Sequence, residues 1–399
     1  MLRKTIFWLH LTAGVIAGVV ILIMSVTGVL LTYEKQMIAW ADRTDAALPP
    51  TGGAARLSID ELMASARTVA EGQITNVTVS SVAGQPALAT VGTKIITLNP
   101  YTGQVIGESA PALRPFFRTV TSRHRYLGAE AGPIRATMRA VTGWSNFLFL
   151  LIVLGGMYLW LPRTWSWQSV RAVLWFRGGL RGKSRDFNWH NAIGIWCAVP
   201  LAVVIAGAMP ISFPWANRLV YQMVGEDVPA PANAANQAAR AGGAGPRGGG
   251  APAEARGEAR APRTPIEPAW QKAEQQVSDW RTIGARVGGN GPIAFTIDRG
   301  YGGQPQLRGT LTVDRASGDV VRWETFDQQS TGRQLRSFLR FAHTGEYFGL
   351  TGQTIAGIAS LGGVVLVWTG IALALRRLFA WRSRRSRPTP ASIPQSNAA

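Results

Sequence analysis

Four long stretches without a charged side chain divide the sequence. They cover residues 5–33, 140–162, 187–217 and 347–375. Each exceeds the roughly 20 residues that a membrane-spanning helix needs. The apolar part of the first stretch is too long for a signal peptide, and no clear small-x-small cleavage site follows it. We therefore expect four transmembrane helices, the first of them a retained anchor.

The two long intervals between these stretches follow a pattern typical of small α+β modules. In the first, Ser58 and Glu61 form a capping box ahead of a helix that runs to Val69, and strands follow at 74–82, 86–91 and 94–108. In the second, a helix around Trp270 precedes strands within 292–297 and 307–324. The segments LNPYTGQVIG (98–107) and VDRASGDVVR (313–322) match each other as strand, glycine turn and strand. This short repeat predicts two related modules.

Residues 229–265 are dominated by alanine, glycine, proline and arginine, which cannot build a core, so we expect a disordered linker there. The predicted domains are the helix 5–33, a first module with its connecting helix (34–139), the helix 140–162, a basic loop (163–186), the helix 187–217, the linker 229–265, a second module (266–330), the helix 347–375 and a tail (376–399).

Lysine and arginine in the short connections predict the orientation in the membrane. Arg3, Lys4, the loop 163–186 and the tail 376–399 are basic, which places both termini in the cytoplasm and both modules in the periplasm of a bacterium. The outer intervals also carry arginine, but long loops cross the membrane largely regardless of charge. The net charge of +19 comes with no nucleic-acid recognition motif, so we expect a lipid bilayer and no nucleic acid as a partner.

The chain contains only four histidines, and each lies in or ahead of one predicted helix: His10, His124, His190 and His343. The predicted orientation puts His10 and His190 near the cytoplasmic face and His124 and His343 near the outer face. Imidazole is the usual axial ligand of haem iron. The arrangement indicates two stacked bis-histidine haems.

A glycine follows three of these histidines by four residues, namely Gly14, Gly194 and Gly128. Residues i and i+4 share a helix face, so each glycine would make room for a flat macrocycle beside the ligand. Arg123, Arg125 and Arg340 could pair with haem propionates or hold an anionic substrate. Other uses compete: an interfacial histidine can anchor a helix or relay protons, and spaced glycines can serve helix packing. A relay would need acidic partners, which these four stretches lack.

Cysteine usage narrows the kind of cofactor. The single cysteine, Cys197, excludes a disulfide within the chain, a cysteine zinc site and an iron–sulfur cluster. The sequence holds no C-x-x-C-H motif, so both haems would be bound non-covalently, as haem b.

Four segments resemble the PepSY-associated transmembrane family: WLHLTAG, GGMYLWLPR, NWHNAIG and HTGEYFGLTGQ. This family includes iron-regulated membrane proteins and inner-membrane ferric-siderophore reductases. The resemblance implies an α-helical membrane protein with four transmembrane helices plus two small α+β, PepSY-like periplasmic modules. In reductase members it also implies haem held by histidines, a role that carries over to His10, His190, His124 and His343 alone.

The function predicted from the sequence is that of a di-haem b-type inner-membrane protein that reduces a periplasmic ferric chelate, such as a ferric siderophore. His10 with His190 would hold one haem, and His124 with His343 the other. Two alternatives stay open at this point. One is a non-redox, membrane-anchored PepSY protein that binds or regulates a periplasmic partner. The other is a chelate transporter, which the absence of intramembrane acids and of repeats within the spans disfavours.

Overall fold

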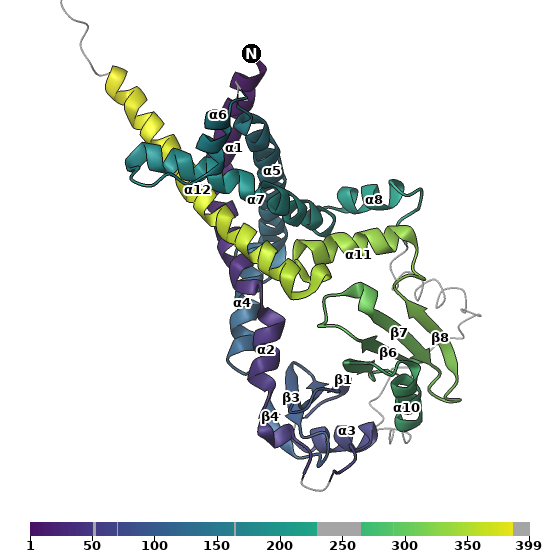
Figure 1. Ribbon diagram of the computed structural model, residues 1–399. Helices are drawn as coiled ribbons and strands as arrows, with labels where there is room; N and C mark the ends of the chain where they lie inside the picture. Colours follow the sequence, from purple (N-terminus) through teal and green to yellow (C-terminus); the bar gives the residue numbers. More distant parts are fainter. Residues whose placement is uncertain (51–52, 70, 163–164, 230–264, 290, 386–399) are drawn as a thin grey trace, which may run out of the picture. The chain divides into compact units, whose positions relative to one another are not determined.

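The computed structural model describes residues 1–50, 53–69, 71–162, 165–229, 265–289 and 291–385 (Figure 1). Nearly all of the expected linker 229–265 and the end of the tail lie outside these ranges. The chain divides into two compact units. The helical unit comprises Met1–Thr32, Thr119–Met209 and the chain from Thr354 onward, and the sheet unit comprises Tyr33–Arg118 and Pro210–Gln353.

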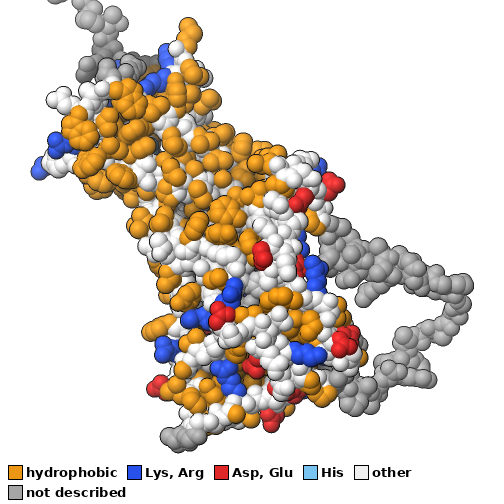
Figure 2. All heavy atoms as spheres, turned by 45° about the vertical axis from the view of Figure 1, so that its right-hand side comes forward, with side chains coloured by type: hydrophobic (Ala, Val, Ile, Leu, Met, Phe, Trp, Pro, Cys, Tyr) orange, Lys and Arg blue, Asp and Glu red, His pale blue; other side chains and the backbone are white. Residues whose placement is uncertain are grey.

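Within the described ranges, four helices are long and apolar enough to cross a membrane. They are α1 (Leu2–Leu31), α5 (Gly132–Trp160), α7 (Gly182–Ser212) and α12 (Gly349–Arg385). Large apolar side chains such as Ile16, Leu154 and Trp368 are exposed on their surfaces. Figure 2 shows hydrophobic side chains covering one side of these helices. An apolar outer surface is what lipid requires, because the bilayer core offers no hydrogen bonds.

The interior of the helical unit is packed by apolar side chains and by glycines at close helix contacts. Val153 of α5, Leu201 and Ile205 of α7, and Ala359 of α12 form one buried cluster. A side chain at Gly362 of α12 would collide with the Cys197 sulfur. Small residues let helix backbones approach closely in lipid, where van der Waals packing holds helices together.

At one end of this unit, basic side chains form hydrogen bonds and an ion pair between the termini of neighbouring helices. The Arg3 guanidinium donates hydrogen bonds to the carbonyls of Leu159 (2.5 Å) and Leu161 (2.9 Å) at the end of α5. Arg376 of α12 lies 3.3 Å from the buried carboxylate of Asp186, at the start of α7. Arg377 of α12 also lies over the ring of Phe7 in α1, at 5.0 Å. The start of α1, the end of α5, the start of α7 and the end of α12 therefore meet, so consecutive long helices run in alternate directions.

A single eight-stranded antiparallel sheet forms the core of the sheet unit, in the order β4-β3-β2-β1-β5-β6-β7-β8. Its strands are β1 (Ile74–Ser80), β2 (Ala87–Val91), β3 (Lys94–Leu98), β4 (Val105–Glu108), β5 (Thr282–Arg286), β6 (Ile293–Asp298), β7 (Arg308–Val313) and β8 (Val320–Thr325). The sequence predicted two modules. In the structure their strands join edge to edge through β1 and β5, with Thr78 opposite Gly284.

Two short helices, α3 (Ile59–Arg67) and α10 (Glu267–Gln276), pack into one core with strands of both halves. The predicted capping box of Ser58 and Glu61 is present at the start of α3. In addition, the two helices cap each other. The Asp60 carboxylate accepts hydrogen bonds from the backbone N–H groups of Ile266 and Glu267, and the Glu267 carboxylate accepts one from Ile59 (2.7 Å).

The two segments of the internal repeat form turns with the same hydrogen bonds. Asn99 and Asp314 occupy equivalent positions, and the side-chain oxygen of each accepts bonds from the backbone N–H groups two and three residues later. Each turn then passes through a glycine with positive φ, +72° at Gly103 and +71° at Gly318. That region of backbone space is open to glycine at little cost.

The described part of the chain also contains shorter α-helices. They are α2 (Glu34–Asp42), α4 (Leu113–Tyr126), α6 (Trp167–Leu174), α8 (Pro214–Gln222) and α11 (Thr331–His343). Between β1 and β5, which pair directly, the chain passes through α5 and α7. Paired strands lie on the same side of a membrane, so two crossings between them are consistent with four spans.

The reciprocal capping of α3 and α10 makes the two halves depend on each other. Replacing Asp60 with alanine leaves two N–H groups of α10 without their acceptor, which costs about 1 kcal/mol at a helix N-terminus. We expect hydrogen exchange of the α10 amides in the intact protein to accelerate roughly fivefold. The exposed Glu71→Ala variant is the control. Unchanged exchange in α10 would contradict the capping role.

Candidate functional site

His10 of α1 faces α5 inside the helical unit. Its Nδ1 lies 3.0 Å from the carbonyl oxygen of Ile152, which can only accept a hydrogen bond. Nδ1 therefore carries the proton, and Nε2 is the nitrogen with the lone pair. A Cβ at Gly156, one turn further along α5, would lie 3.2 Å from Cε1 of His10. Gly156 thus gives the imidazole ring room against the helix.

His190 of α7 has an equivalent environment on α12. Its Nδ1 lies 2.9 Å from the hydroxyl of Thr369. That hydroxyl already donates to the carbonyl of Val365 (2.8 Å), so it accepts the proton of Nδ1. A Cβ at Gly370 would lie 3.4 Å from Cε1 of His190. The second imidazole is thereby fixed in the same tautomer as the first.

The rings of His10 and His190 lie close together, with centroids 6.2 Å apart and planes at 84°. A metal–nitrogen bond is about 2 Å long, so two imidazoles on opposite sides of one metal ion place their centroids roughly 6 Å apart. The structure thus brings together the pair that the sequence assigned to the cytoplasmic layer. At this spacing the two rings could bind one metal ion between them.

His124, near the end of α4, repeats the arrangement with α1. Its Nδ1 lies 2.9 Å from the hydroxyl of Thr27, which donates to the carbonyl of Ile23 (2.6 Å). A Cβ at Gly28 would lie 3.8 Å from Cε1 of His124. Here too the hydrogen bond selects the tautomer with the lone pair on Nε2.

His343 is the last residue of α11 and belongs to the sheet unit. The turn after it is held by two interlocking glycines: a side chain at Gly345 or Gly352 would overlap the backbone of the other. Gly345 also has a positive φ of +74°. The glycines of HTGEYFGLTG therefore shape the entry to α12. The pairing of His343 with His124 stays a prediction from the sequence.

The three glycines predicted to accompany the histidines differ in surroundings. Gly14 and Gly194 lie inside helices and are half-buried; a Cβ at Gly14 would meet no atom within 4 Å, and one at Gly194 only Leu366 at 3.7 Å. Gly128 lies beyond the end of α4 at Tyr126 and has a φ of +89°. It therefore does not share a helical face with His124. The left-handed turn accounts for glycine at this position.

The predicted arginines lie on two helices. Arg123 and Arg125 are in the last turn of α4, and Arg340 is in α11. Arg125 lies over the ring of Tyr126 at 5.3 Å, and Arg340 over that of Phe341 at 5.4 Å. A hydrogen bond from the Arg135 guanidinium lowers the pKa of the Tyr126 phenol, with smaller contributions from nearby arginine charges. This end of α4 therefore favours anions.

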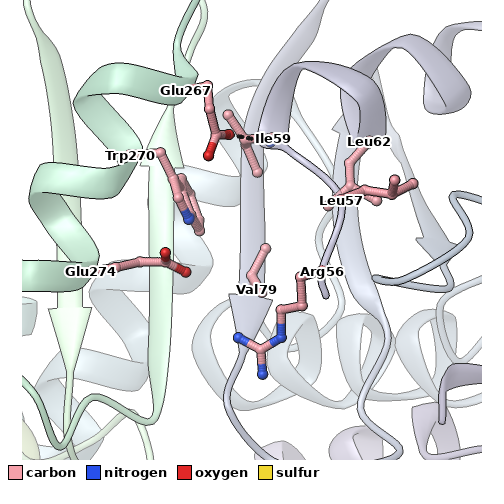
Figure 3. A pocket seen from close by; sticks show the side chains of 8 residues that line it. All are labelled: Arg56, Leu57, Ile59, Leu62, Val79, Glu267, Trp270 and Glu274. Atoms are coloured by element: carbon pink, nitrogen blue, oxygen red, sulfur yellow. Dashed lines mark hydrogen bonds between the residues drawn. The ribbon is translucent and has the colours of Figure 1, made fainter. Parts of the chain in front are cut away.

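The sheet unit holds a small cavity of about 70 Å³ between α3 and α10 (Figure 3). Trp270, Val79 and Leu62 line it, with Arg56, Glu267 and Glu274 as its charged groups. Glu267 is already used to cap α3, and Arg56 lies over the ring of Trp280 at 5.4 Å. Cofactor sites commonly measure roughly 300–1,000 Å³. This cavity is too small for a cofactor and marks the joint between the two halves of the sheet.

The histidine arrangement suits one class of metal centre. Among the described residues, no group of three or more histidine, cysteine or acidic side chains is placed to hold a metal ion. Two imidazoles supply only two ligands, so the others would come from a macrocycle. Each ring is also oriented through its second nitrogen, as is usual for metal-bound histidine. These residues fit axial ligation of haem iron.

Sequence reasoning missed the residues that orient the rings. They are Ile152 with Gly156, Thr369 with Gly370, and Thr27 with Gly28. In two of the three cases the partner is a Thr-Gly dipeptide within a long apolar helix, where the threonine accepts a hydrogen bond and the glycine lies beside the ring. A Thr-Gly dipeptide in an apolar helix is therefore the sequence feature that could have identified these hydrogen-bond partners.

The fold defines a class of protein before any comparison is made. Four long apolar helices and an eight-stranded antiparallel sheet with short helices make this a multi-pass helical membrane protein with an α+β extramembrane region. The PepSY-associated TM region family model matches residues 7–377, which is nearly the whole chain. The chain belongs to this family, as its motifs predicted. No curated protein matches the sequence significantly.

The contact between Gly156 and His10 generates a first prediction about the site. A methyl group at Gly156 would press on the imidazole, and overpacking of this kind commonly costs about 1–3 kcal/mol. We expect Gly156→Ala to weaken haem binding about tenfold or more in absorbance titrations of the purified protein. Gly155→Ala is the matched control, because its Cβ would meet only Ile6 at 3.5 Å. Equal affinity in the two variants would contradict the assignment.

Proposed function

We propose that this protein is a b-type cytochrome of the bacterial inner membrane that carries electrons outward and reduces a ferric chelate, such as a ferric siderophore, in the periplasm. The observation that carries the proposal is the pair His10 and His190, whose ring centroids are 6.2 Å apart and whose Nδ1 atoms both donate hydrogen bonds. A second haem is predicted at His124 and His343. Both termini are predicted to be cytoplasmic.

The residues around His10 and His190 would hold the haem iron on both sides. A haem with two protein ligands supplies reversible one-electron transfer and has no open position for oxygen chemistry. The carbonyl of Ile152 and the hydroxyl of Thr369 keep Nε2 of each imidazole unprotonated and available to the metal. Both imidazoles are half-buried among the helices of the bundle. These features support electron transfer over ligand activation.

Reduction is a sensible way to release iron from a chelate. Hard oxygen ligands hold ferric iron far better than ferrous iron, so one electron weakens the complex. The electron would have to cross the thickness of the membrane. From His10 to Tyr33 the chain rises roughly 35 Å at the helical rise per residue. One haem near each face would divide this distance into two steps.

Colour is the direct test of the proposal. We expect the purified protein, supplied with haem, to bind two haems and to give the reduced-minus-oxidised spectrum of a b-type cytochrome. His10→Ala and His190→Ala should each remove about half of the bound haem, because each iron needs both ligands. Asn191→Ala, next to His190, is the control. A folded protein that stays colourless in the presence of haem contradicts the proposal.

The substrate class can be tested separately. In proteoliposomes that contain a reductant, the reduced cytochrome should be reoxidised when a ferric siderophore is added outside, and ferrous iron should appear in a chelator trap. The gallium complex of the same siderophore has the same shape and charge but accepts no electron, so it should leave the spectrum unchanged. Reoxidation by neither complex would exclude this chelate as the acceptor.

The hydrogen bond from His190 to Thr369 predicts a shift in midpoint potential. Donation from Nδ1 makes the imidazole a more basic ligand and stabilises the ferric state. Thr369→Val keeps the shape and removes the acceptor, so the potential of one haem should become more positive in a redox titration. Thr351→Val, on the same helix but exposed, should have no effect. An unchanged or more negative potential in Thr369→Val would argue against ligation by His190.

A further inference from the structure

One buried polar group of the helical unit is not explained by the fold. Trp160 is the last residue of α5, and its indole Nε1 is buried without a hydrogen-bond partner among the described residues. A buried donor without an acceptor loses its interaction with water and gains nothing in return. Such groups are rare in folded proteins and call for an explanation, of which a bound ligand that supplies the acceptor is one.

Trp160 belongs to the face of α5 that meets His10. Ile152, Gly156 and Trp160 follow one another at intervals of four residues, which places them on one side of the helix. The carbonyl of Ile152 binds Nδ1 of His10, and Gly156 lies against the same ring. The indole of Trp160 is therefore one turn beyond the imidazole, toward the basic end of the unit.

Arg3 supplies a positive charge at the same level. Its guanidinium bonds the carbonyls of Leu159 and Leu161, the two neighbours of Trp160 along the chain. Arg3 precedes His10 by seven residues, or about 10 Å along the helix. That distance is comparable to the reach from the centre of a porphyrin to its propionate carboxylates. A guanidinium has five N–H donors, so its two carbonyl bonds leave others for an anion.

We propose that the Trp160 indole N–H and the Arg3 guanidinium form a carboxylate subsite that binds a propionate of the haem held by His10 and His190. The inference rests on the proposed function and assigns two residues to that site. A carboxylate at membrane depth needs both a donor and a compensating charge. Trp160 and Arg3 supply one of each, next to the ligand His10.

The test compares haem with its dimethyl ester, which has the same ring and iron but no carboxylates. Haem release to an excess of apomyoglobin is followed in a His343→Ala background, where the His10–His190 site is the one predicted to stay filled. Trp160→Phe keeps an aromatic ring and removes the N–H. We expect haem to leave this variant about tenfold faster than the parent, since a hydrogen bond to a charged group is lost. The dimethyl ester should leave both proteins at the same rate.

Arg3→Gln should likewise accelerate the release of haem strongly and the release of the dimethyl ester only slightly. Lys4→Gln and Trp165→Phe are the controls for charge and for loss of an indole, and should release haem like the parent. Vibrational bands of the propionates should shift in Trp160→Phe and not in Trp165→Phe.

Two results would overturn the subsite and leave the proposed function in place. One is a Trp160→Phe protein that releases haem at the parental rate, and the other is an equal acceleration of haem and ester. A wild-type protein that binds neither haem nor ester contradicts the proposed function itself, so the two failures are distinguishable.

Discussion

The helical unit depends on one constraint: a polar imidazole nitrogen buried among apolar helices needs a hydrogen-bond partner. In each of three cases the structure gives Nδ1 an acceptor on a neighbouring helix, a carbonyl for His10 and a threonine hydroxyl for His124 and His190. Each hydroxyl is itself fixed, because it donates to the carbonyl four residues earlier. This fixes the ring, its tautomer and the nitrogen that a metal would meet.

The same constraint explains where glycine is needed in the bundle. A ring that reaches an acceptor on a neighbouring helix must approach that helix closely; the contact is tightest at Gly156, where a Cβ would lie 3.2 Å from His10, and looser at Gly370 and Gly28, where it would lie 3.4 and 3.8 Å from the ring. Gly28 and Gly370 directly follow the accepting threonines, and Gly156 lies one turn from the accepting carbonyl of Ile152. Hydrogen bonding and close approach are thus provided by adjacent positions. This coupling makes the three histidines part of the packing as well as candidates for ligation.

The sequence predicted the elements well because their signals are local. The four spans follow from uncharged length, the start of α3 from its capping box, and the repeated turns from the glycines Gly103 and Gly318. The strand β5 was missed, since TIGAR is short, contains a glycine and lacks a clear alternation. Without β5, the union of the two modules in one sheet could not be seen. The family match confirms the predicted class of membrane protein.

The partners of the histidines were beyond the reach of the sequence for a different reason. Thr369 is 179 residues from His190, and Ile152 is 142 residues from His10. Which helix faces which is decided by packing among four similar apolar segments, and no local pattern encodes it. The orphan nitrogen of Trp160 is likewise visible only once its surroundings are known.

The pairing of β1 with β5 has a consequence for how the protein is made. The ribosome synthesises β1 long before β5. The two helices α5 and α7 lie between these strands in the sequence and must insert into the bilayer before β1 and β5 can pair. During that interval the first half of the sheet has an open edge at β1, which is a template for unwanted strand pairing. The Asp60 carboxylate also has no backbone N–H groups of α10 to accept from until that helix has been synthesised. Completion of the sheet unit therefore depends on insertion of α5 and α7, and a delay in insertion leaves the edge of β1 exposed for longer.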